Sequence, residues 1–466
     1  MAVASQTNYP NAELARSSSP LASILAPFAD VGAPKWLFGA AVAAAASFNT
    51  VDVNYGYTTG EDHVGLDWQV AIKLIIGLGC AGLGGLAVIF SDRTRRALFA
   101  FPGCVLVGLA LTLILASLVA LPEARTVSRV ASVINFGYVL FVAGALSVLG
   151  LKRTITIVLL ALVANLMANW ALYLALPNSI GVFEEELAGK TFVRRMGGLG
   201  HPNSIARTAV SAGIIALAML RSRVLVPTVQ TGRLFLVSIV ILSAATLVAT
   251  YSRTSVVAWM TASGFLMIDK IFTRRGMVCI SFVLALGLLA GVGYELFGGG
   301  VSGKSVLAIF TKTGDVEELT SATGRTAIWL ESIRLIGLSP ITGYGLNSAP
   351  FLLVDHSLHT HNIVLHALFS GGILAGILMA GLLSWNLFRG LISSEPLVRA
   401  VCMYILVSGT FEDTAVDTFA SPSTLLWYVV LLVPAIEALM VRGVSAAPAE
   451  SHTAPLSTSP ELAPTS

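Results

Sequence analysis

Long apolar runs alternate with short polar loops along most of this 466-residue sequence. Because a helix that crosses a bilayer needs roughly 20 mostly apolar residues, each such run predicts a membrane-spanning helix. By this criterion about twelve runs qualify. They lie at residues 34–50, 68–90, 97–120, 128–149, 155–176, 203–220, 234–250, 254–269, 277–297, 362–385, 397–411 and 424–441. The sequence therefore predicts an all-α, multi-pass membrane protein.

The composition excludes other classes of protein. Charged residues make up 11% of the chain and hydrophobic residues 55%, whereas a soluble domain carries about 25% charged residues. The net charge is +3 and the basic residues form short clusters between apolar runs, which argues against nucleic-acid binding. The four cysteines lie in apolar runs without CxxC spacing, so we interpret them as packing residues.

Basic residues in the short loops predict the orientation, because cytoplasmic loops retain Lys and Arg. With a cytoplasmic N-terminus, every loop predicted to be inside contains basic residues, such as Lys152 and Arg153. The last outer loop instead holds Glu412, Asp413 and Asp417 without any Lys or Arg. We therefore expect both termini in the cytoplasm.

Three regions follow from this topology. Residues 1–33 and 443–466 are expected to be disordered cytoplasmic tails, and residues 34–442 form the transmembrane domain. The largest outer loop spans about 297–361 and is expected to be partly helical. Within it, Arg325–Leu338 has the apolar and polar faces of an amphipathic helix, which we expect to lie flat on the outer membrane surface beside a cavity.

Arginine and histidine occur on the outer side, where basic residues are normally rare. They lie in the stretches Gly197–Arg207, Tyr251–Ser255, Ser321–Thr326 and His359–Asn362. A charge at the centre of a membrane helix costs at least roughly 2.5–3.5 kcal/mol, so such residues usually line a polar cavity. Several cations on one side predict an anionic ligand. A lipid diphosphate fits, because its tail lies in the bilayer and Arg pairs bidentately with phosphate.

Each of these residues also has a structural interpretation. Arg207 fits a side chain that reaches the interface from a helix start. Arg253 fits a turn residue between two helices, Arg325 a solvated residue at a helix start, and His201 an ordinary loop histidine. The functional interpretation rests on taking the residues together.

Histidines gather on or near the predicted outer face. They are His201, His356, His359, His361 and His366. Imidazole is a common metal ligand, but apart from Asp355 no carboxylate or cysteine lies at ligand spacing. The alternative is a general base, since a neutral imidazole with an ordinary pKa near 6.5 can take a proton from a sugar hydroxyl. We favour the base, and we expect neither a metal nor another cofactor.

At these stretches the sequence resembles the O-antigen ligase-like family, which includes lipopolysaccharide O-antigen ligases and related O-antigen and exopolysaccharide polymerases. The resemblance covers roughly residues 195–385. It is carried by His-Pro-Asn with the following Arg207, by Ser-Arg-Thr-Ser, by Gly-Arg-x-x-x-Trp followed by Pro-x-x-Gly-x-Gly, and by His-Asn before a Gly-rich helix. In the last motif His361, Asn362 and Gly372 match the family pattern, whereas Ala375 stands where the family has Gly, Thr or Tyr.

The resemblance implies a membrane glycosyltransferase whose fold is similar to that of the lipid-donor (GT-C type) glycosyltransferases. The donor would be a glycan on undecaprenyl diphosphate. A hydroxyl of the acceptor, lipid A-core or another glycan, would attack the anomeric carbon, with inversion and without a metal. The reaction would take place at the periplasmic face of the bacterial inner membrane.

The resemblance also implies roles for single residues. Arg207, Arg253 and Arg325 would bind the diphosphate, and His361 would act on the acceptor hydroxyl. The supporting contacts would come from His201, Asn203, His359, Asn362 and Tyr344. For Tyr344, between two glycines, the alternatives are stacking on a sugar and packing of a turn.

Two other functions remain open at this stage. A polymerase would join repeat units by the same transfer to a second lipid-linked glycan. A transporter or flippase would use the same cationic cavity without a base, but the sequence has no pair of matching interrupted helices in two halves. A purely structural membrane protein would not need clustered outer Arg and His.

Overall fold

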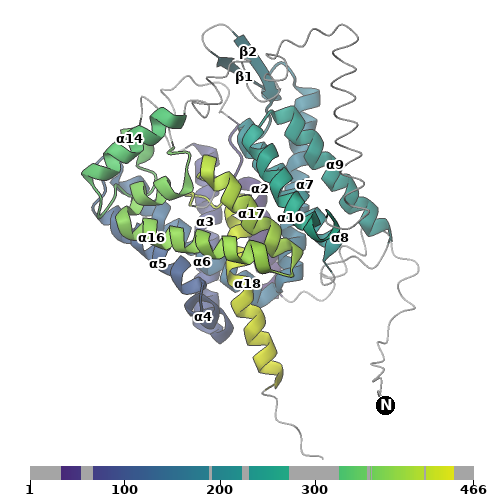
Figure 1. The fold of residues 1–466 in the computed structure, drawn as a ribbon, viewed down its shortest axis with the longest axis horizontal. Coiled ribbons are helices and arrows are strands. Elements are labelled where there is room, and N and C mark those ends of the chain that lie inside the picture. Colours follow the sequence, from purple (N-terminus) through teal and green to yellow (C-terminus); the bar gives the residue numbers. More distant parts are fainter. Residues whose placement is uncertain are drawn as a thin grey trace, which may run out of the picture.

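The computed structural model describes residues 33–53, 67–187, 191–222, 230–271, 325–353, 357, 359–413 and 416–445. In this part the chain is a bundle of helices with one two-stranded hairpin (Figure 1). Before the hairpin come α2 (Ala33–Phe48), α3 (Trp68–Phe90), α4 (Asp92–Phe99), α5 (Gly103–Leu118), α6 (Arg125–Leu149) and α7 (Leu151–Ala175). After it come α8 (Pro202–Arg221), α9 (Gln230–Thr250), α10 (Arg253–Ile271), α14 (Arg325–Leu338), α15 (Ala349–Leu352), α16 (Ile363–Ile392), α17 (Pro396–Phe411) and α18 (Pro422–Ser445).

Each predicted apolar run contains a helix, except the run at 277–297, which lies outside the described residues. The predicted terminal tails and the part of the outer loop before Arg325 also lie largely outside them. Among the described helices, 6 are long and apolar enough to cross a membrane, and the pair α4–α5, bent by 80°, makes up to 7. The chain is thus a multi-pass membrane protein, and the full set of about twelve spans stays a prediction.

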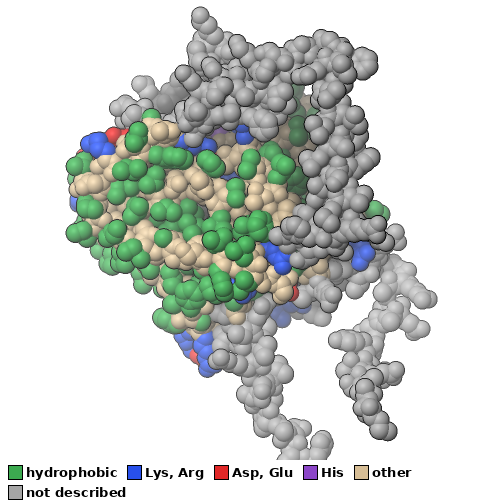
Figure 2. Space-filling model, viewed as in Figure 1, with side chains coloured by type: hydrophobic (Ala, Val, Ile, Leu, Met, Phe, Trp, Pro, Cys, Tyr) green, Lys and Arg blue, Asp and Glu red, His purple; other side chains and the backbone are tan. Residues whose placement is uncertain are grey.

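Apolar side chains cover much of the outside of the bundle. On α3, for example, Ile75 is 70% exposed and Phe90 is 81% exposed. Figure 2 shows such side chains spread across one face, with Lys and Arg gathered toward its upper and lower edges. A contiguous apolar surface of this kind marks an interaction site. In a multi-pass membrane protein, this surface contacts the lipid tails of the bilayer.

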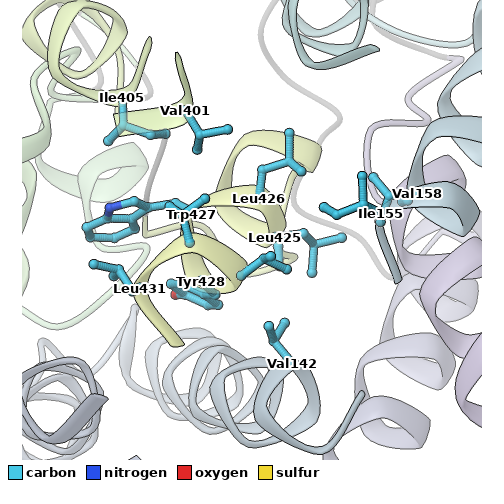
Figure 3. Packing of buried hydrophobic residues seen from close by; sticks show 14 of the residues in the cluster. Val142, Ile155, Val158, Val401, Ile405, Leu425, Leu426, Trp427, Tyr428 and Leu431 are labelled. Carbon is cyan, nitrogen blue, oxygen red and sulfur yellow. The ribbon is translucent and has the colours of Figure 1, made fainter. Parts of the chain in front are cut away.

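The first half of helix α18 packs inside the bundle against α6, α7 and α17. Figure 3 shows Trp427 and Tyr428 of α18 with Val142 of α6, Ile155 of α7 and Val401 of α17. All five side chains are buried. A helix enclosed in this way fixes the position of the loop that precedes it.

Two buried amides hold that loop, which connects α17 to α18. Asn49, just after α2, donates from Nδ2 to the carbonyl oxygen of Ala420 at 2.8 Å. Asn135 of α6 donates from Nδ2 to the carbonyl oxygen of Asp417 at 3.1 Å. An unpaired buried polar group costs about 1–3 kcal/mol, so these bonds favour one position of the loop.

A β-hairpin lies between α7 and α8, in a segment predicted to be on the outer side. Strands β1 (Val182–Leu187) and β2 (Thr191–Met196) are antiparallel, with Val182 opposite Met196. Glu184 and Arg194 lie opposite each other and form an ion pair at 3.2 Å; opposite charges at such positions stabilise strand pairing. These strands were not predicted from the sequence.

Arg195 ties the hairpin to the helices. Its Nε donates to the carbonyl oxygen of Thr250 at 2.8 Å, and its Nη2 donates to Oδ1 of Asn203 at 2.7 Å. Thr250 ends α9 and Asn203 lies in the first turn of α8. The hairpin therefore sits at the end of the bundle where α8 and α10 begin.

Helix α14 occupies the residues predicted for the amphipathic helix. Ile328 and Leu335 are buried, whereas Leu330, Ile333 and Leu338 are more than half exposed. The buried pair packs toward α16 and the short helix α15. The exposed apolar residues agree with a position against lipid, which remains a prediction.

The turn after α14 pairs with a break in α16. Gly372 has φ of +67° inside α16, a conformation that favours glycine. At this break the amides of Tyr344 and Gly345 donate to the carbonyl oxygens of Phe369 and Ser370, both at 2.8 Å. The Pro-x-x-Gly-x-Gly stretch and the glycine of the His-Asn motif thus belong to one structural joint.

Candidate active site

The α17–α18 loop joins a histidine and an arginine through one carboxylate. Arg325 donates from Nη2 to Oε1 of Glu412 at 2.7 Å, and Nδ1 of His361 lies 3.3 Å from Oε2. Arg325 begins α14 and His361 lies two residues before α16. Arg325 also lies 3.4 Å from the hydroxyl of Thr254, and its guanidinium stands 5.9 Å from the centre of the Phe411 ring.

Glu412 is negatively charged in this setting. Burial alone would raise the pKa of its carboxyl, but the hydrogen bond with His361 and the positive charge of Arg325 lower that pKa below its usual range. A carboxylate can only accept hydrogen bonds, so the proton of a neutral His361 ring resides on Nδ1. Its Nε2 then presents a lone pair, as a general base requires.

A second acid–histidine pair lies beside the first. Nδ1 of His359 is 3.3 Å from Oδ2 of Asp413, and Nδ1 of His366 is 3.9 Å from the same oxygen. The rings of His359 and His361 meet edge to face, with their centres 6.2 Å apart. Two carboxylates of one loop thus face three histidines.

The two adjacent histidines have different electrostatic settings. Burial would lower the pKa of His359, but the charge and hydrogen bond of Asp413 outweigh it and raise this pKa to about 9. His359 is therefore a cation at neutral pH. Its side chain remains 48% exposed, so water screens part of this attraction.

Asp417 and Arg207 also belong to this cluster of charged residues and histidines. Burial and the negative charge of Asp413 raise the pKa of Asp417 to about 7, against the opposing charges of Arg207 and His359. Arg207, in the second turn of α8, also lowers the pKa of Glu412. Its Nη2 donates to the hydroxyl of Ser204 at 3.3 Å. The positive charges of Arg207 and Arg325 therefore both stabilise the carboxylate of Glu412 in the α17–α18 loop.

Arg253 lies at the same end of the bundle. It is the first residue of α10 and precedes Thr254, which contacts Arg325. Tyr251, which lies in the turn between α9 and α10, has φ of +51°. The three predicted arginines thus come from the starts of three helices, α8, α10 and α14.

Two predicted supporting residues act as helix caps. Nδ1 of His201 accepts from the amide of Asn203 at 3.3 Å and caps α8. The Asn362 side chain accepts from two amides at the start of α16 and donates to the carbonyl oxygen of Thr410 at 3.1 Å. Caps satisfy amides that a helix leaves unpaired, so both residues orient the helix starts next to the site.

Tyr344 packs the turn after α14. Its ring lies 5.2 Å from that of Phe369, and its hydroxyl donates to the carbonyl oxygen of Leu335 at 2.9 Å. These contacts agree with the packing alternative. The role of Tyr344 toward a sugar stays a prediction.

From the sequence, Glu412, Asp413 and Asp417 were predicted only to lie in an acidic outer loop. The signal that was available is that this loop carries three carboxylates without Lys or Arg, on the same predicted side of the membrane as the singled-out arginines and histidines. Among the described residues, no group of three or more His, Cys, Asp or Glu is arranged to hold a metal ion. His356 and Asp355 lie outside those residues.

Comparison with known families gives one match. Residues 238–380 match the family model described as O-antigen ligase, which is less than a third of the chain. The matched range contains Arg253, Arg325 and His361, whereas Arg207 and Glu412 lie outside it. No curated protein matches the chain significantly.

Proposed function

We propose that this protein, whose residues 238–380 match the family model described as O-antigen ligase, transfers a glycan from undecaprenyl diphosphate to a hydroxyl of an acceptor sugar. The acceptor is lipid A-core or another surface glycan. The observation that carries the proposal is the contact of Glu412 with both Arg325 and His361. It joins a candidate base to a candidate phosphate-binding cation.

The transfer is a single displacement. His361 takes the proton of the acceptor hydroxyl on Nε2 while the hydroxyl oxygen bonds to the anomeric carbon. The bond from that carbon to the diphosphate breaks, and its electron pair leaves with the phosphate. Glu412 stabilises the imidazolium, as a carboxylate does in other histidine bases. Attack opposite the leaving group inverts the anomeric carbon.

Arg207, Arg253 and Arg325 bind the diphosphate and stabilise the charge that develops on it. Their common position at one end of the bundle supports this role. A guanidinium has five N–H donors, so the contact of Arg325 with Glu412 leaves donors for phosphate oxygens. The cationic His359 adds positive charge nearby. With this charge supplied by side chains, we expect no metal or other cofactor.

The lipid of the donor enters from the bilayer. The exposed Leu330, Ile333 and Leu338 of α14 support a helix that lies on the outer surface of the inner membrane. In this position α14 presents Arg325, its first residue, at the depth of the donor phosphates. The proposed site then faces the periplasm, in a fold of the GT-C type.

The same chemistry serves a polymerase, whose acceptor is a second lipid-linked glycan. A transporter is disfavoured by the contact between His361 and Glu412, since transport needs no base.

The test is product analysis with the full-length protein in lipid nanodiscs. It receives a lipid-diphosphate glycan with either lipid A-core or a second lipid-linked glycan, in the presence and absence of a chelator. We expect a new glycosidic bond and free undecaprenyl diphosphate from the wild type, and almost none from Arg325→Ala. Arg334→Ala is the matched control, because Arg334 pairs with Glu331 on an exposed part of α14.

The result that overturns the proposal is a donor left intact by the wild type with both acceptors. Movement of the intact donor across a vesicle membrane would instead indicate a transporter. Activity that disappears with the chelator and returns with a divalent ion would assign His359 and His361 as metal ligands.

A further inference from the structure

A cavity of about 300 Å³ lies under the β-hairpin. Its walls are the turn 177–180, the start of β1, the glycine-rich stretch 197–200 and the residues after α2. Figure 1 shows the hairpin at one end of the bundle. Ligand pockets measure about 300–1,000 Å³, so this one suits a monosaccharide or disaccharide.

Close backbone packing forms the cavity. Gly198 has φ of +136°, and a Cβ there would lie 2.5 Å from Oδ1 of Asn169. The same amide oxygen accepts from the amide of Leu199 at 2.8 Å, and the amide of Asp52 donates to the carbonyl oxygen of Leu199 at 2.6 Å. The glycine-rich stretch is thus fixed between α7 and the end of α2.

The side chains of the cavity suit a hydroxyl-rich ligand. Asp52 and Glu184 present carboxylates, Arg194 a guanidinium and Phe183 an aromatic ring. Glu184 and Arg194 pair at 3.2 Å but remain 56% and 59% exposed, so both have capacity for a ligand. Carboxylates accept from sugar hydroxyls, and an aromatic ring packs against apolar C–H groups. Two carboxylates against one cation disfavour a phosphate here.

The cavity adjoins the candidate active site. The ring of Phe183 meets that of His201 edge to face, with centres 5.0 Å apart. His201 caps α8, and Arg207 lies six residues further along that helix, about 9 Å at 1.5 Å per residue. A glycan that extends from the transfer site by a few sugars can therefore reach the cavity.

We propose that this cavity is a carbohydrate subsite, which binds an uncharged sugar of one glycan substrate at a distance from the reacting bond. The inference rests on the proposed function for its substrate class. The bound glycan comes from either the donor or the acceptor, which share this chemistry. Binding at the subsite positions that substrate and sets which glycans are accepted.

The test measures binding without transfer. Saturation-transfer NMR on the full-length protein in nanodiscs uses two probes: the oligosaccharide released by mild acid from the cells' lipid-diphosphate pool, and the delipidated acceptor glycan. We expect one probe to bind, which identifies the source. Its affinity should fall about tenfold in Asp52→Asn or Glu184→Gln, the effect of weakening a hydrogen bond to a charged group. Glu123→Gln, an exposed carboxylate on the α5–α6 loop, should leave it unchanged.

Transfer assays separate this proposal from the proposed function. We expect the pocket variants to raise KM for the bound substrate with kcat unchanged. Binding of neither probe to the wild type overturns the subsite, as does equal affinity in all variants, even if Arg325→Ala abolishes transfer. Binding that depends on Asp52 and Glu184 without any transfer supports the subsite and overturns the proposed function instead.

Discussion

Arg325 and Glu412 meet at 2.7 Å although 87 residues separate them in the chain. Both side chains are largely buried, at 14% and 11% exposure. Removing one partner of a buried ion pair leaves the other charge uncompensated. The pair therefore fixes the start of α14 against the α17–α18 loop, and His361 is oriented by the same carboxylate.

The first prediction concerns Glu412. Glu412→Gln keeps the shape of the side chain but removes the charge that orients His361. A hydrogen bond to a charged group contributes about 1.5–3 kcal/mol, so we expect turnover to fall about 10- to 150-fold with little change in donor affinity. Steady-state kinetics and donor-binding titrations measure the two quantities. Glu331→Gln, whose ion-pair partner Arg334 is 59% exposed, is the control.

The features that could be predicted from the sequence are those that the bilayer imposes on single segments. Helix positions, α14 included, follow from apolar length and spacing within single segments. The predicted amphipathic pattern of α14 is not seen, because apolar residues lie on both its buried and its exposed side. The partners of Glu412 lie 51 and 87 residues away, so no local pattern indicated its role. The hairpin pairs residues close in the chain, such as Glu184 with Arg194, but its strands are too polar to stand out as apolar segments.

A second prediction separates the two adjacent histidines. His361→Ala removes the proposed base, so we expect turnover to fall roughly 10²–10⁴-fold while donor binding persists. His359→Ala removes a half-exposed cation and should have a smaller effect on turnover. Single-turnover kinetics with bound donor measure the chemical step. Equal losses in both variants would contradict the assignment of the base to His361.

The third prediction concerns Arg207. Arg207→Ala should nearly abolish transfer, and Arg207→Lys should restore little, because an ammonium cannot make the bidentate contact of a guanidinium with phosphate. The readout is transfer by variants purified in equal amounts. Arg233→Ala, an exposed residue of α9, is the control. Near wild-type transfer by Arg207→Ala would show that the side chain only reaches the interface.

A fourth prediction concerns the break in α16. A Cβ on Gly372 would overlap the carbonyl oxygen of Ile341, and the φ of +67° disfavours any other residue. We expect Gly372→Ala to destabilise the protein by roughly 1–3 kcal/mol, seen as a lower Tm in detergent. Gly381→Ala in the same helix has open space and should leave Tm unchanged or raise it slightly. Equal Tm values for the two variants would contradict the importance of the contact between this break in α16 and the turn after α14.

The last prediction concerns pH and the pair of His359 with Asp413. The folded-state pKa of His359 is raised to about 9, above the value near 6.5 for an unfolded chain. Its stabilising contribution is therefore fully present below about pH 6.5 and is lost as pH rises through about 9. Because the imidazole is half exposed, the effect should be small and should weaken in high salt. Hydrogen exchange in the 412–417 loop measures it, with His359→Gln as the reference. We expect the wild-type loop to be better protected than the variant at pH 6 and equally protected at pH 10. The same difference at both pH values would mean that His359 is not held as a cation by Asp413.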